Sequence, residues 1–364
     1  MREPLIIVVA INEAFAMPLA VTIRSVLENL ASETEIRLFV LADAVPPETR
    51  AKIERSWEPY AISTHWIVPD YASIAHLLVS HGHSGVPASY FRMLMAELLP
   101  ASVERAVYLD SDIVVTGDLT PLGELAFEGN LVLAVPDAYR RSHHVLRLSA
   151  LELTETSRFT EHDRYFNSGV MVVDIAGWRQ AGIAREAVAF AARHGDAIIY
   201  HDQDVLNCIL KGRWGALAPI WNLHEMPHSL RTWECYSPDP DERRELIRAP
   251  RVVHFVSSDK PWHAICFHGF QQPQFLDALS RTEFRDYRVP DLPLGQRLFH
   301  YGLVYPSVLI NWGLWRGLIH ARDPQILAWL CQQILRRPWG LLTYPAWLCF
   351  MSLRDLWRAR GRAP

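Results

Sequence analysis

Two aspartates one residue apart, Asp110 and Asp112, are the side chains whose types and spacing could do chemistry. They follow a predicted strand over 105–109 that is apolar on both faces, as is typical of a buried parallel strand. Ligands of open α/β sheets bind outside the carboxyl ends of the strands. Because an unpaired buried carboxylate is costly, a divalent cation holding a diphosphate would stabilise the pair. The alternative is two solvated acids in a turn, since the pattern alone is weak.

Three further motifs follow along the chain. Asn167-Ser168-Gly169 is predicted to form a turn that leads into a strand over 170–175, and turn chemistry alone would explain it. Asp202 and Gln203 open a predicted helix, where Asp202 could equally be an N-cap. His254 lies in a predicted strand over 251–257, followed by Lys260-Pro261-Trp262. A single histidine in a strand is more often a satisfied core residue than a ligand.

The elements that must position these residues alternate between strand and helix. Helices are predicted over 16–30, after Pro46 and over 87–99. Such alternation calls for an α/β fold with a mostly parallel sheet and helices on both faces. The strands predicted from apolar runs are 5–11, 35–41, 62–68, 105–109, 131–135, 170–175 and 251–257.

In their order along the chain, the four motifs resemble glycosyltransferase family 8, over about residues 5–270. This family comprises retaining enzymes, including lipopolysaccharide galactosyl- and glucosyltransferases. The resemblance implies a GT-A fold, a nucleotide-diphospho-sugar transferase fold with a Rossmann-like, mostly parallel sheet. It also implies transfer of a glucose- or galactose-type hexose from a UDP-sugar to a glycan or glycolipid acceptor, as in lipopolysaccharide or polysaccharide biosynthesis.

The resemblance also implies roles for individual residues. Asp110, Asp112 and His254 match the metal ligands, and two carboxylates with one imidazole suit Mn²⁺ better than Mg²⁺, which remains the alternative. The catalytic positions match Asp137, Asp202, Gln203 and Lys260, and Lys260 would neutralise the diphosphate leaving group. The nucleotide-sugar site matches Ala10, Asn12, Phe15, Arg92, Asp110, Ser111, Asp112, Asn167, Asp202, Gln203, His254 and Lys260.

Charge accounting favours one of two retaining mechanisms. Gln203, a neutral amide, is a poor covalent nucleophile, which favours same-face internal return with the leaving phosphate accepting the acceptor's proton. A double displacement through Asp202 or Asp204 stays open, because retaining glycosidases use a carboxylate nucleophile.

One stretch departs from the family pattern. The family usually has an A-x-D-x-N-Y-like turn after its first strand, and this chain has Ala10-Ile11-Asn12-Glu13-Ala14-Phe15. Asn12 and Phe15 could contact ribose and uracil, but the side chain of Ala14 cannot form a hydrogen bond. The altered turn favours an alternative function, a nucleotide-sugar-binding or interaction protein that has lost turnover. The complete set of Asp110, Asp112, His254 and Lys260 argues against it.

Composition limits the other classes of function. The 364 residues include 36 Lys+Arg and 40 Asp+Glu. The net charge of −4 does not show the excess of basic residues that is typical of proteins that bind nucleic acid. Five scattered cysteines without a C-x-x-C pair argue against a disulfide framework or zinc site and fit a reducing compartment. The apolar N-terminal run is predicted to be the first strand, not a signal peptide. We therefore expect a cytoplasmic protein.

The C-terminal segment differs sharply in composition. From Arg297 onward it contains nine arginines, no lysine, two aspartates and six of the 13 tryptophans. We therefore predict a catalytic domain over 1–272, a connecting helix or linker over 273–296 and a helical tail over 297–364. Arginines and aromatic rings among leucines predict helices that associate with the anionic inner face of the membrane. The alternatives are a helical subdomain packed on the catalytic domain and an oligomer interface.

Deletion of residues 297–364 is expected to release the protein from membranes while donor hydrolysis is retained, because the basic and aromatic surface is lost. Sedimentation with vesicles that contain anionic lipid measures the release. If the truncated protein still sediments with these vesicles, the tail is not the membrane-binding element.

Overall fold

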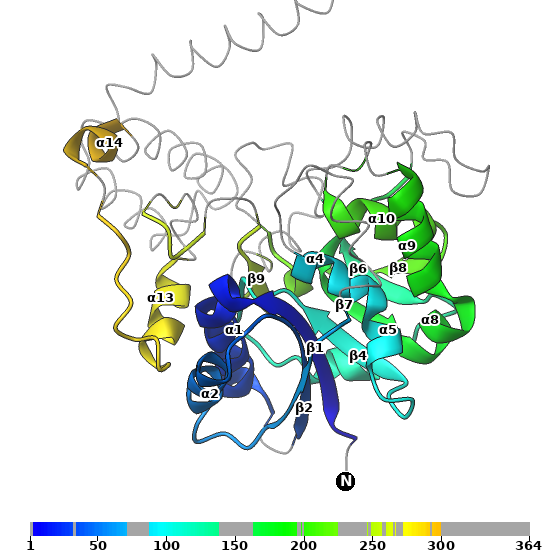
Figure 1. Ribbon diagram of the computed structural model, residues 1–364, viewed down its shortest axis with the longest axis horizontal. Helices are drawn as coiled ribbons and strands as arrows, with labels where there is room; N and C mark the ends of the chain where they lie inside the picture. The colour runs from blue at the N-terminus through cyan, green and yellow to red at the C-terminus, as the bar shows by residue number, and fades with distance from the viewer. Residues whose placement is uncertain are drawn as a thin grey trace, which may run out of the picture.

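The computed structural model (Figure 1) describes most of the chain up to Phe299. The tail predicted over 297–364 lies outside the described residues from residue 300 onward, so its membrane role stays a prediction. The described ranges are 3–31, 34–70, 87–137, 163–194, 198, 200–224, 246, 249–256, 260–264, 266, 272–291 and 293–299.

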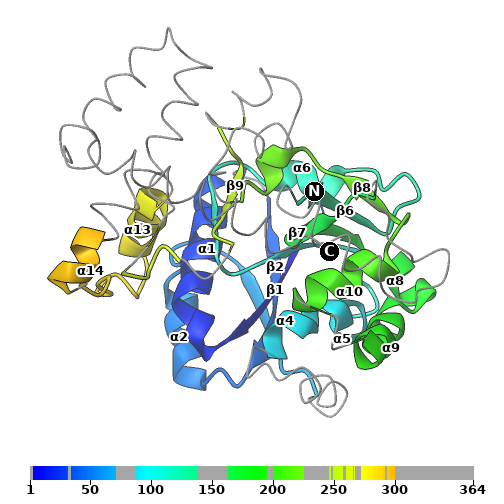
Figure 2. The same cartoon turned by 90° about the horizontal axis from the view of Figure 1, so that it is seen from above.

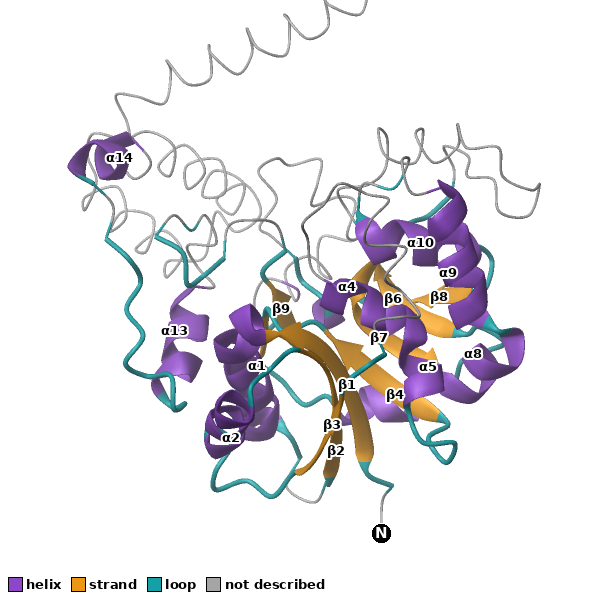
Figure 3. Cartoon of the chain, viewed as in Figure 1, coloured by secondary structure: helices purple, strands orange, loops and turns teal. Residues whose placement is uncertain are grey.

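A twisted seven-stranded sheet forms the centre of the protein (Figure 3). Its strand order is β3-β2-β1-β4-β7-β6-β8. β1 pairs in parallel with β2 and β4, β2 with β3, and β6 with β8, whereas β7 runs antiparallel to β4 and β6. The predicted α/β fold with a mostly parallel sheet is confirmed. The strands are β1 Leu5–Asn12, β2 Ile36–Asp43, β3 Ser63–Ile67, β4 Arg105–Leu109, β6 Val132–Pro136, β7 Phe166–Asp174 and β8 Trp214–Ala216.

Helices cover both faces of this sheet, with α1 and α2 on one side and α4, α5, α8, α9 and α10 on the other (Figure 2). Among the helices in the described part of the chain, none combines the length and hydropathy needed to span a bilayer. The helices are α1 Ala16–Asn29, α2 Pro47–Arg55, α4 Pro87–Phe91, α5 Met95–Leu98, α6 Thr120–Glu124, α8 Ile175–Ala181, α9 Ile183–His194, α10 His201–Ile209, α13 Gln272–Ser280 and α14 Leu294–Phe299, with 3₁₀ segments η1 Glu13–Phe15, η3 Arg92–Leu94 and η5 Pro219–Trp221.

The strand period of two explains why β1 is apolar throughout. Ile7 and Val9 pack on the face that α1 and α2 cover, and Val8 and Ala10 pack on the opposite face. Ile7, Val8 and Val9 are fully buried. Each such aliphatic side chain contributes about 1.5–3 kcal/mol relative to an exposed position. A strand buried on both faces reads as a continuous apolar run, which is why the sequence predicted it correctly.

A second, two-stranded sheet lies beside the end of β4. β5 (Ile113–Val115) pairs antiparallel with β9 (Val252–His254), and Ile113 lies opposite His254. The backbone N–H of Phe255 donates to the carbonyl of Asp112 at 3.0 Å, which extends this pairing. The sequence predicted a strand in the region of β9, although a longer one, but neither β5 nor β8. The pairing brings His254 beside the two aspartates.

Helix α1 fixes the backbone that follows the aspartates. The buried Thr22 hydroxyl lies 2.8 Å from the carbonyl oxygens of both Ser111 and Ile113. One turn later, the Ser25 hydroxyl accepts the backbone N–H of Val115 at 2.9 Å. The side chains of the helix thereby form hydrogen bonds with polar backbone groups that burial would otherwise leave unpaired. The segment from Ser111 to Val115 is therefore held from both α1 and β9.

Two local predictions are wrong in detail. Asn167-Ser168-Gly169 does not form a turn but lies within β7, because the backbone N–H of Asp110 donates to the Gly169 carbonyl at 2.8 Å and continues the strand ladder. The single helix predicted over 87–99 consists of α4, the 3₁₀ segment η3 and α5. Arg92 begins η3 and is buried. Both stretches contribute side chains, Arg92 and Asn167, to one cleft at the carboxyl end of β4.

Candidate active site

A cleft of about 400 Å³ lies outside the carboxyl end of β4. It brings together nine residues that the sequence pointed to, which come from distant parts of the chain: Arg92, Asp110, Asp112, Asp137, Asn167, Asp202, Gln203, His254 and Lys260. The remaining lining residues are Ser168, Tyr200, His201, His224 and Val256. The position agrees with the rule that ligands of α/β sheets bind at the carboxyl ends of strands.

Three side chains in the cleft form a potential metal-binding cluster. One ligand atom each from Asp110, Asp112 and His254 lies within 4.8 Å of the others. Nε2 of His254 is 3.2 Å from Oδ1 of Asp112 and 3.6 Å from Oδ2 of Asp110. His254 is buried but directs this nitrogen at the carboxylates. Two carboxylate oxygens and an imidazole nitrogen fit a divalent cation such as Mn²⁺.

Gly169 provides the space for this cluster. A Cβ atom at this position would collide with Cε1 of His254, and would lie 2.7 Å from its Nδ1 and 2.8 Å from Oδ2 of Asp110. The sequence suggested that this glycine serves a turn. Its actual requirement is the close approach of two side chains to the backbone of β7, which only a residue without Cβ permits.

Arg92 counters the negative charge on the other side of the cluster. Its Nη2 is 2.8 Å from Oδ1 of Asp110, and its Nε is 3.0 Å from Oδ2 of Asp202. Its guanidinium also donates to the carbonyl of Ser168 and lies over the ring of Tyr108. Burial opposes the charge of Arg92, but the two carboxylates outweigh it and raise its pKa. The fixed fork of an arginine suits this bridging position.

Asp202 is not an N-cap. Helix α10 has Tyr200 at its N-cap, and the carboxylate of Asp204 accepts the backbone N–H of Tyr200 at 2.9 Å. Asp202 instead pairs with Arg92 and accepts the Ser168 hydroxyl at 3.1 Å. Burial raises the pKa of Asp202 to about 6, although Arg92 works against this rise. Its carboxylate thus faces the cleft as part of the charge network.

Lys260 supplies a second cationic side chain to the cleft, after Arg92. Its Nζ donates to Oδ2 of Asp112 and to the carbonyl of Phe255, each at 2.6 Å. Burial alone would raise the pKa of Asp112, but the positive charge of Lys260 and hydrogen bonds to the carboxylate act against burial and hold that pKa below its ordinary value. Asp112 therefore remains ionised, which is the state that a metal ligand needs.

A hydrogen-bond network around the carboxylate of Asp137 forms the far wall. Nε2 of Gln203 donates to Oδ2 of Asp137 at 3.2 Å, and Nδ2 of Asn167 lies 3.5 Å from the same oxygen. The backbone N–H of Ser168 donates to Oε1 of Gln203 at 3.0 Å. All four residues are buried. These contacts join the end of β6, strand β7 and helix α10 around one carboxylate.

Four predicted nucleotide-sugar residues do not line this cleft. Ala10 lies in the apolar core, and the backbone carbonyl of Ser111 accepts from Thr22. Oδ1 of Asn12 is buried and makes no hydrogen bond within the described part of the chain. The ring of Phe15 packs edge-on against Trp262 with centroids 6.0 Å apart. Their contacts with a nucleotide stay predictions.

Sequence reasoning did not identify Asn222 or His224. Asn222 is fully buried and lies 3.0 Å from Nδ1 of His254, and the ring of His224 lies edge-on to that of His254. No local pattern marks these residues, because they follow the short segment η5 and reach the site through pairing with β9. The backbone N–H of Leu223 donates to the carbonyl of Val252 at 2.9 Å.

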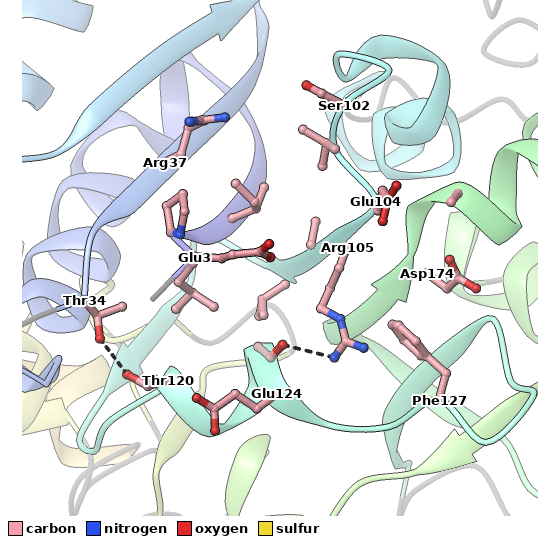
Figure 4. A pocket seen from close by; sticks show the side chains of 18 residues that line it. Glu3, Thr34, Arg37, Ser102, Glu104, Arg105, Thr120, Glu124, Phe127 and Asp174 are labelled. Atoms are coloured by element: carbon pink, nitrogen blue, oxygen red, sulfur yellow. Dashed lines mark hydrogen bonds between the residues drawn. The ribbon is translucent and has the colours of Figure 1, made fainter. Parts of the chain in front are cut away.

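A larger cavity of about 830 Å³ lies at the opposite end of the sheet (Figure 4). Glu3, Arg37, Glu104 and Glu124 line it with mostly exposed side chains. Within the described ranges, Asp110, Asp112 and His254 are the only group of His, Cys, Asp or Glu side chains placed to share a cation. The chemistry is therefore concentrated in the smaller cleft.

Comparison with known proteins agrees with the site. The profile of glycosyl transferase family 8 matches residues 6–266. General stress protein A of Bacillus subtilis (strain 168) is 28% identical over 279 residues, which cover 74% of this chain and 91% of that protein. Lipopolysaccharide 1,2-glucosyltransferase of Escherichia coli (strain K12) is 30% identical over 180 residues, 48% of this chain and 49% of that enzyme. The match thus spans about half the length of the latter relative.

Solved structures show the same fold. Galactosyltransferase LgtC, in complex with donor and acceptor sugar analogues, superposes with a TM-score of 0.65 and 22% identity, covering 80% of this chain and 99% of that one. The bifunctional glycosyltransferase WbbM superposes with a TM-score of 0.58 and 17% identity, covering 78% of this chain and 50% of that one. The predicted GT-A fold is confirmed.

Replacement of Gly169 by alanine is expected to weaken Mn²⁺ binding by at least roughly tenfold, because the new methyl group displaces His254 or Asp110 from the cluster. Isothermal titration with Mn²⁺ measures the change. Gly295→Ala is the matched control, since a Cβ there meets nothing within 4 Å. Equal Mn²⁺ affinity in Gly169→Ala and the wild type would show that Gly169 does not serve the cluster.

Proposed function

The chain belongs to glycosyltransferase family 8, and from that premise we propose that it transfers a hexose from a UDP-sugar to a glycan or glycolipid, with retention at the anomeric carbon and with Mn²⁺ as cofactor. The chain is a glycosyltransferase, like the relatives it matches. The observation that carries the finer proposal is the meeting of Asp110, Asp112 and His254 within 4.8 Å, with Lys260 beside them.

The donor set supports a divalent cation held by these three ligands. Gly169 leaves the room that the cluster needs, and the lowered pKa of Asp112 keeps that ligand ionised. A bound Mn²⁺ would supply Lewis-acid charge to the diphosphate of the donor. Arg92 keeps Asp110 in position through the contact of 2.8 Å. The same arginine prevents the repulsion between Asp110 and Asp202 from opening the site.

Lys260 is suited to the leaving group. Breaking the sugar–phosphate bond places negative charge on the diphosphate, and a nearby ammonium group stabilises that charge. The ammonium of Lys260 contacts Asp112 at the edge of the cluster, where a diphosphate that shares the cation would lie. Its flexible stem allows the ammonium group to move from Asp112 to a phosphate oxygen.

Hydroxyl recognition is best assigned to the far wall of the cleft. Asp137, Asn167 and Gln203 present a carboxylate and two amides, a combination that can both accept and donate hydrogen bonds. Burial raises the pKa of Asp202 although Arg92 acts against this rise, and this position is suited to a sugar hydroxyl that replaces water. Whether the hexose is of the glucose or galactose type depends on one hydroxyl, and the donor experiment below decides it.

The contacts of the acidic residues support internal return. Asp204 is fully buried, and its two oxygens accept from the Tyr165 hydroxyl at 2.6 Å and the Tyr200 N–H at 2.9 Å. A carboxylate held in this way outside the cleft lining is a poor nucleophile. Gln203 is neutral and held at both ends of its amide.

In the proposed reaction, the bond from the anomeric carbon to phosphate breaks, and a bond to the acceptor oxygen forms on the same face. The leaving phosphate takes the proton of the acceptor hydroxyl, so no side chain has to act as a base. The pairing of Asp202 with Arg92 and Ser168 lowers its nucleophilicity but does not remove it from the cleft. Double displacement through Asp202 is therefore the rival to be tested.

UDP release is expected with one UDP-sugar from a panel, in the presence of Mn²⁺ and not of EDTA, because the cluster provides the charge that the leaving group needs. Asp110→Asn is expected to reduce release by at least about 100-fold, since it removes a ligand and leaves Arg92 with one partner fewer. Asp277→Asn, at an exposed position outside the cleft, is the control.

Two outcomes would contradict this proposal. Release that is unaffected by EDTA and by Asp110→Asn would exclude the metal role of the cluster. Absence of release with every sugar, together with Mn²⁺-dependent binding of a UDP-sugar in a thermal-shift experiment, would favour the alternative of a nucleotide-sugar-binding protein without turnover.

The internal-return mechanism predicts that no covalent sugar–enzyme intermediate accumulates. Rapid-quench samples taken during turnover, analysed by intact-protein mass spectrometry, are expected to show no protein carrying one hexose residue. Gln203→Ala is expected to lower kcat by roughly 10–100-fold without abolishing it. The variant loses a positioned neutral dipole, but it does not lose a group that forms a bond to the sugar. An adduct that maps to Asp202 would establish double displacement instead.

A further inference from the structure

We propose that Asn222 is a positioning residue that sets the tautomer of His254, so that Nε2 of this histidine presents a lone pair to the cluster. The inference rests on the proposed metal role of Asp110, Asp112 and His254. It explains how His254 can serve as a ligand, because the geometry of the three ligands does not by itself determine which ring nitrogen of His254 carries the proton. A histidine with its proton on Nε2 cannot bind the cation with that atom.

The hydrogen-bond directions begin at a backbone group. The N–H of Gly169 can only donate, and it lies 3.0 Å from Oδ1 of Asn167. This contact fixes the orientation of the Asn167 amide, because the atom facing a backbone N–H must be the oxygen. The oxygen of an amide has two lone pairs and can accept a second hydrogen bond. Its second neighbour is the amide of Asn222.

The orientation of the Asn222 amide follows from this contact, and it determines which nitrogen of His254 carries a hydrogen. Nδ2 of Asn222 donates to Oδ1 of Asn167 at 2.8 Å, so the remaining atom of the Asn222 amide is Oδ1. This oxygen lies 3.0 Å from Nδ1 of His254 and can only accept. Nδ1 must therefore carry a hydrogen. A neutral imidazole carries one N–H, so Nε2, which lies 3.2 Å from Oδ1 of Asp112, is the nitrogen whose lone pair is available when His254 holds a cation.

Burial makes this chain of contacts decisive. Asn222 is fully buried, and Asn167 and His254 are each less than a tenth exposed. Water is thus poorly placed to replace any of the three partners, and the low local dielectric strengthens each contact. The backbone around Asn222 is itself fixed to β9, since the N–H of His254 donates to the Leu223 carbonyl at 2.9 Å. The amide and the ring that it orients are carried by neighbouring chain segments.

A purely structural role for Asn222 makes a different prediction from a positioning role. Asn222→Leu keeps the approximate volume but removes both polar contacts. Asn222→Asp removes the donor to Asn167 but keeps an acceptor for Nδ1–H of His254. If Asn222 only fills space, leucine is the milder change. If it sets the tautomer, aspartate is the milder change for the metal, because an acceptor for Nδ1–H is the part that matters.

The experiment compares Mn²⁺ affinity in full-length protein, without donor or acceptor, by electron paramagnetic resonance of free Mn²⁺. Asn222→Leu is expected to weaken binding about 10–100-fold, the usual effect of removing a partner of a metal-bound histidine. Asn222→Asp is expected to bind at least about tenfold more tightly than Asn222→Leu. Asn130→Leu is the control, because Asn130 donates to the carbonyl of Phe127 away from the cleft.

A second measurement reports the tautomer without metal. Long-range ¹H–¹⁵N spectra of ¹⁵N-histidine-labelled protein are expected to show Nδ1–H for His254 in the wild type, and loss of that preference in Asn222→Leu. His254 is assigned by its absence in His254→Ala. A wild-type His254 whose proton lies on Nε2 would overturn the inference directly.

The affinity measurements can also overturn it. Equal Mn²⁺ affinity in Asn222→Leu and the wild type, or equal losses in the leucine and aspartate variants, would each contradict the positioning role. If the leucine variant does not fold, a loss of affinity in Asn222→Asp as large as in Gly169→Ala would contradict it. A wild-type protein that binds no Mn²⁺ would contradict the proposed metal, and the tautomer in the metal-free spectra would then decide the inference separately.

Discussion

Four carboxylates line one cleft where water cannot screen them fully, and the repulsion among three of them, Asp110, Asp112 and Asp202, is the constraint on which the surrounding structure depends. Arg92 bridges Asp110 and Asp202, and Lys260 pairs with Asp112. Without these cations the carboxylates would take up protons or separate. A divalent cation at the cluster would complete the same charge balance, so the requirement for stability and the proposed requirement for catalysis coincide.

The groups that surround the carboxylates come from different parts of the fold. Arg92 begins the 3₁₀ segment η3, which interrupts the helical region before β4. Its guanidinium lies in the cleft at the carboxyl end of β4. His254 arrives through the pairing of β9 with β5. Thr22 on α1 ties down the backbone beside Asp112. The core packing of α1, β4 and β9 and the placement of the charges therefore depend on the same contacts.

The backbone of β7 gives the site both space and direction. Gly169 provides room for His254 and Asp110, and its N–H starts the hydrogen-bond sequence through Asn167 and Asn222. The adjacent Ser168 N–H orients the amide of Gln203. Two successive backbone donors thus orient the side chains on the two walls of the cleft. This arrangement explains why a strand occupies the stretch in which turn-forming residue types predicted a turn.

The sequence by itself determined the features that depend on neighbours along the chain. Apolar runs located β1, β2 and β4, and the order of the four motifs indicated the family, because hydrophobic period and motif spacing are local properties. Only the tertiary structure decided whether His254 was a core residue or a member of the cluster, since that depends on its pairing opposite Ile113. It likewise decided that Gly169 serves close packing and that Asp202 faces Arg92. These roles follow from distances between segments remote in sequence, and no local pattern encodes such distances.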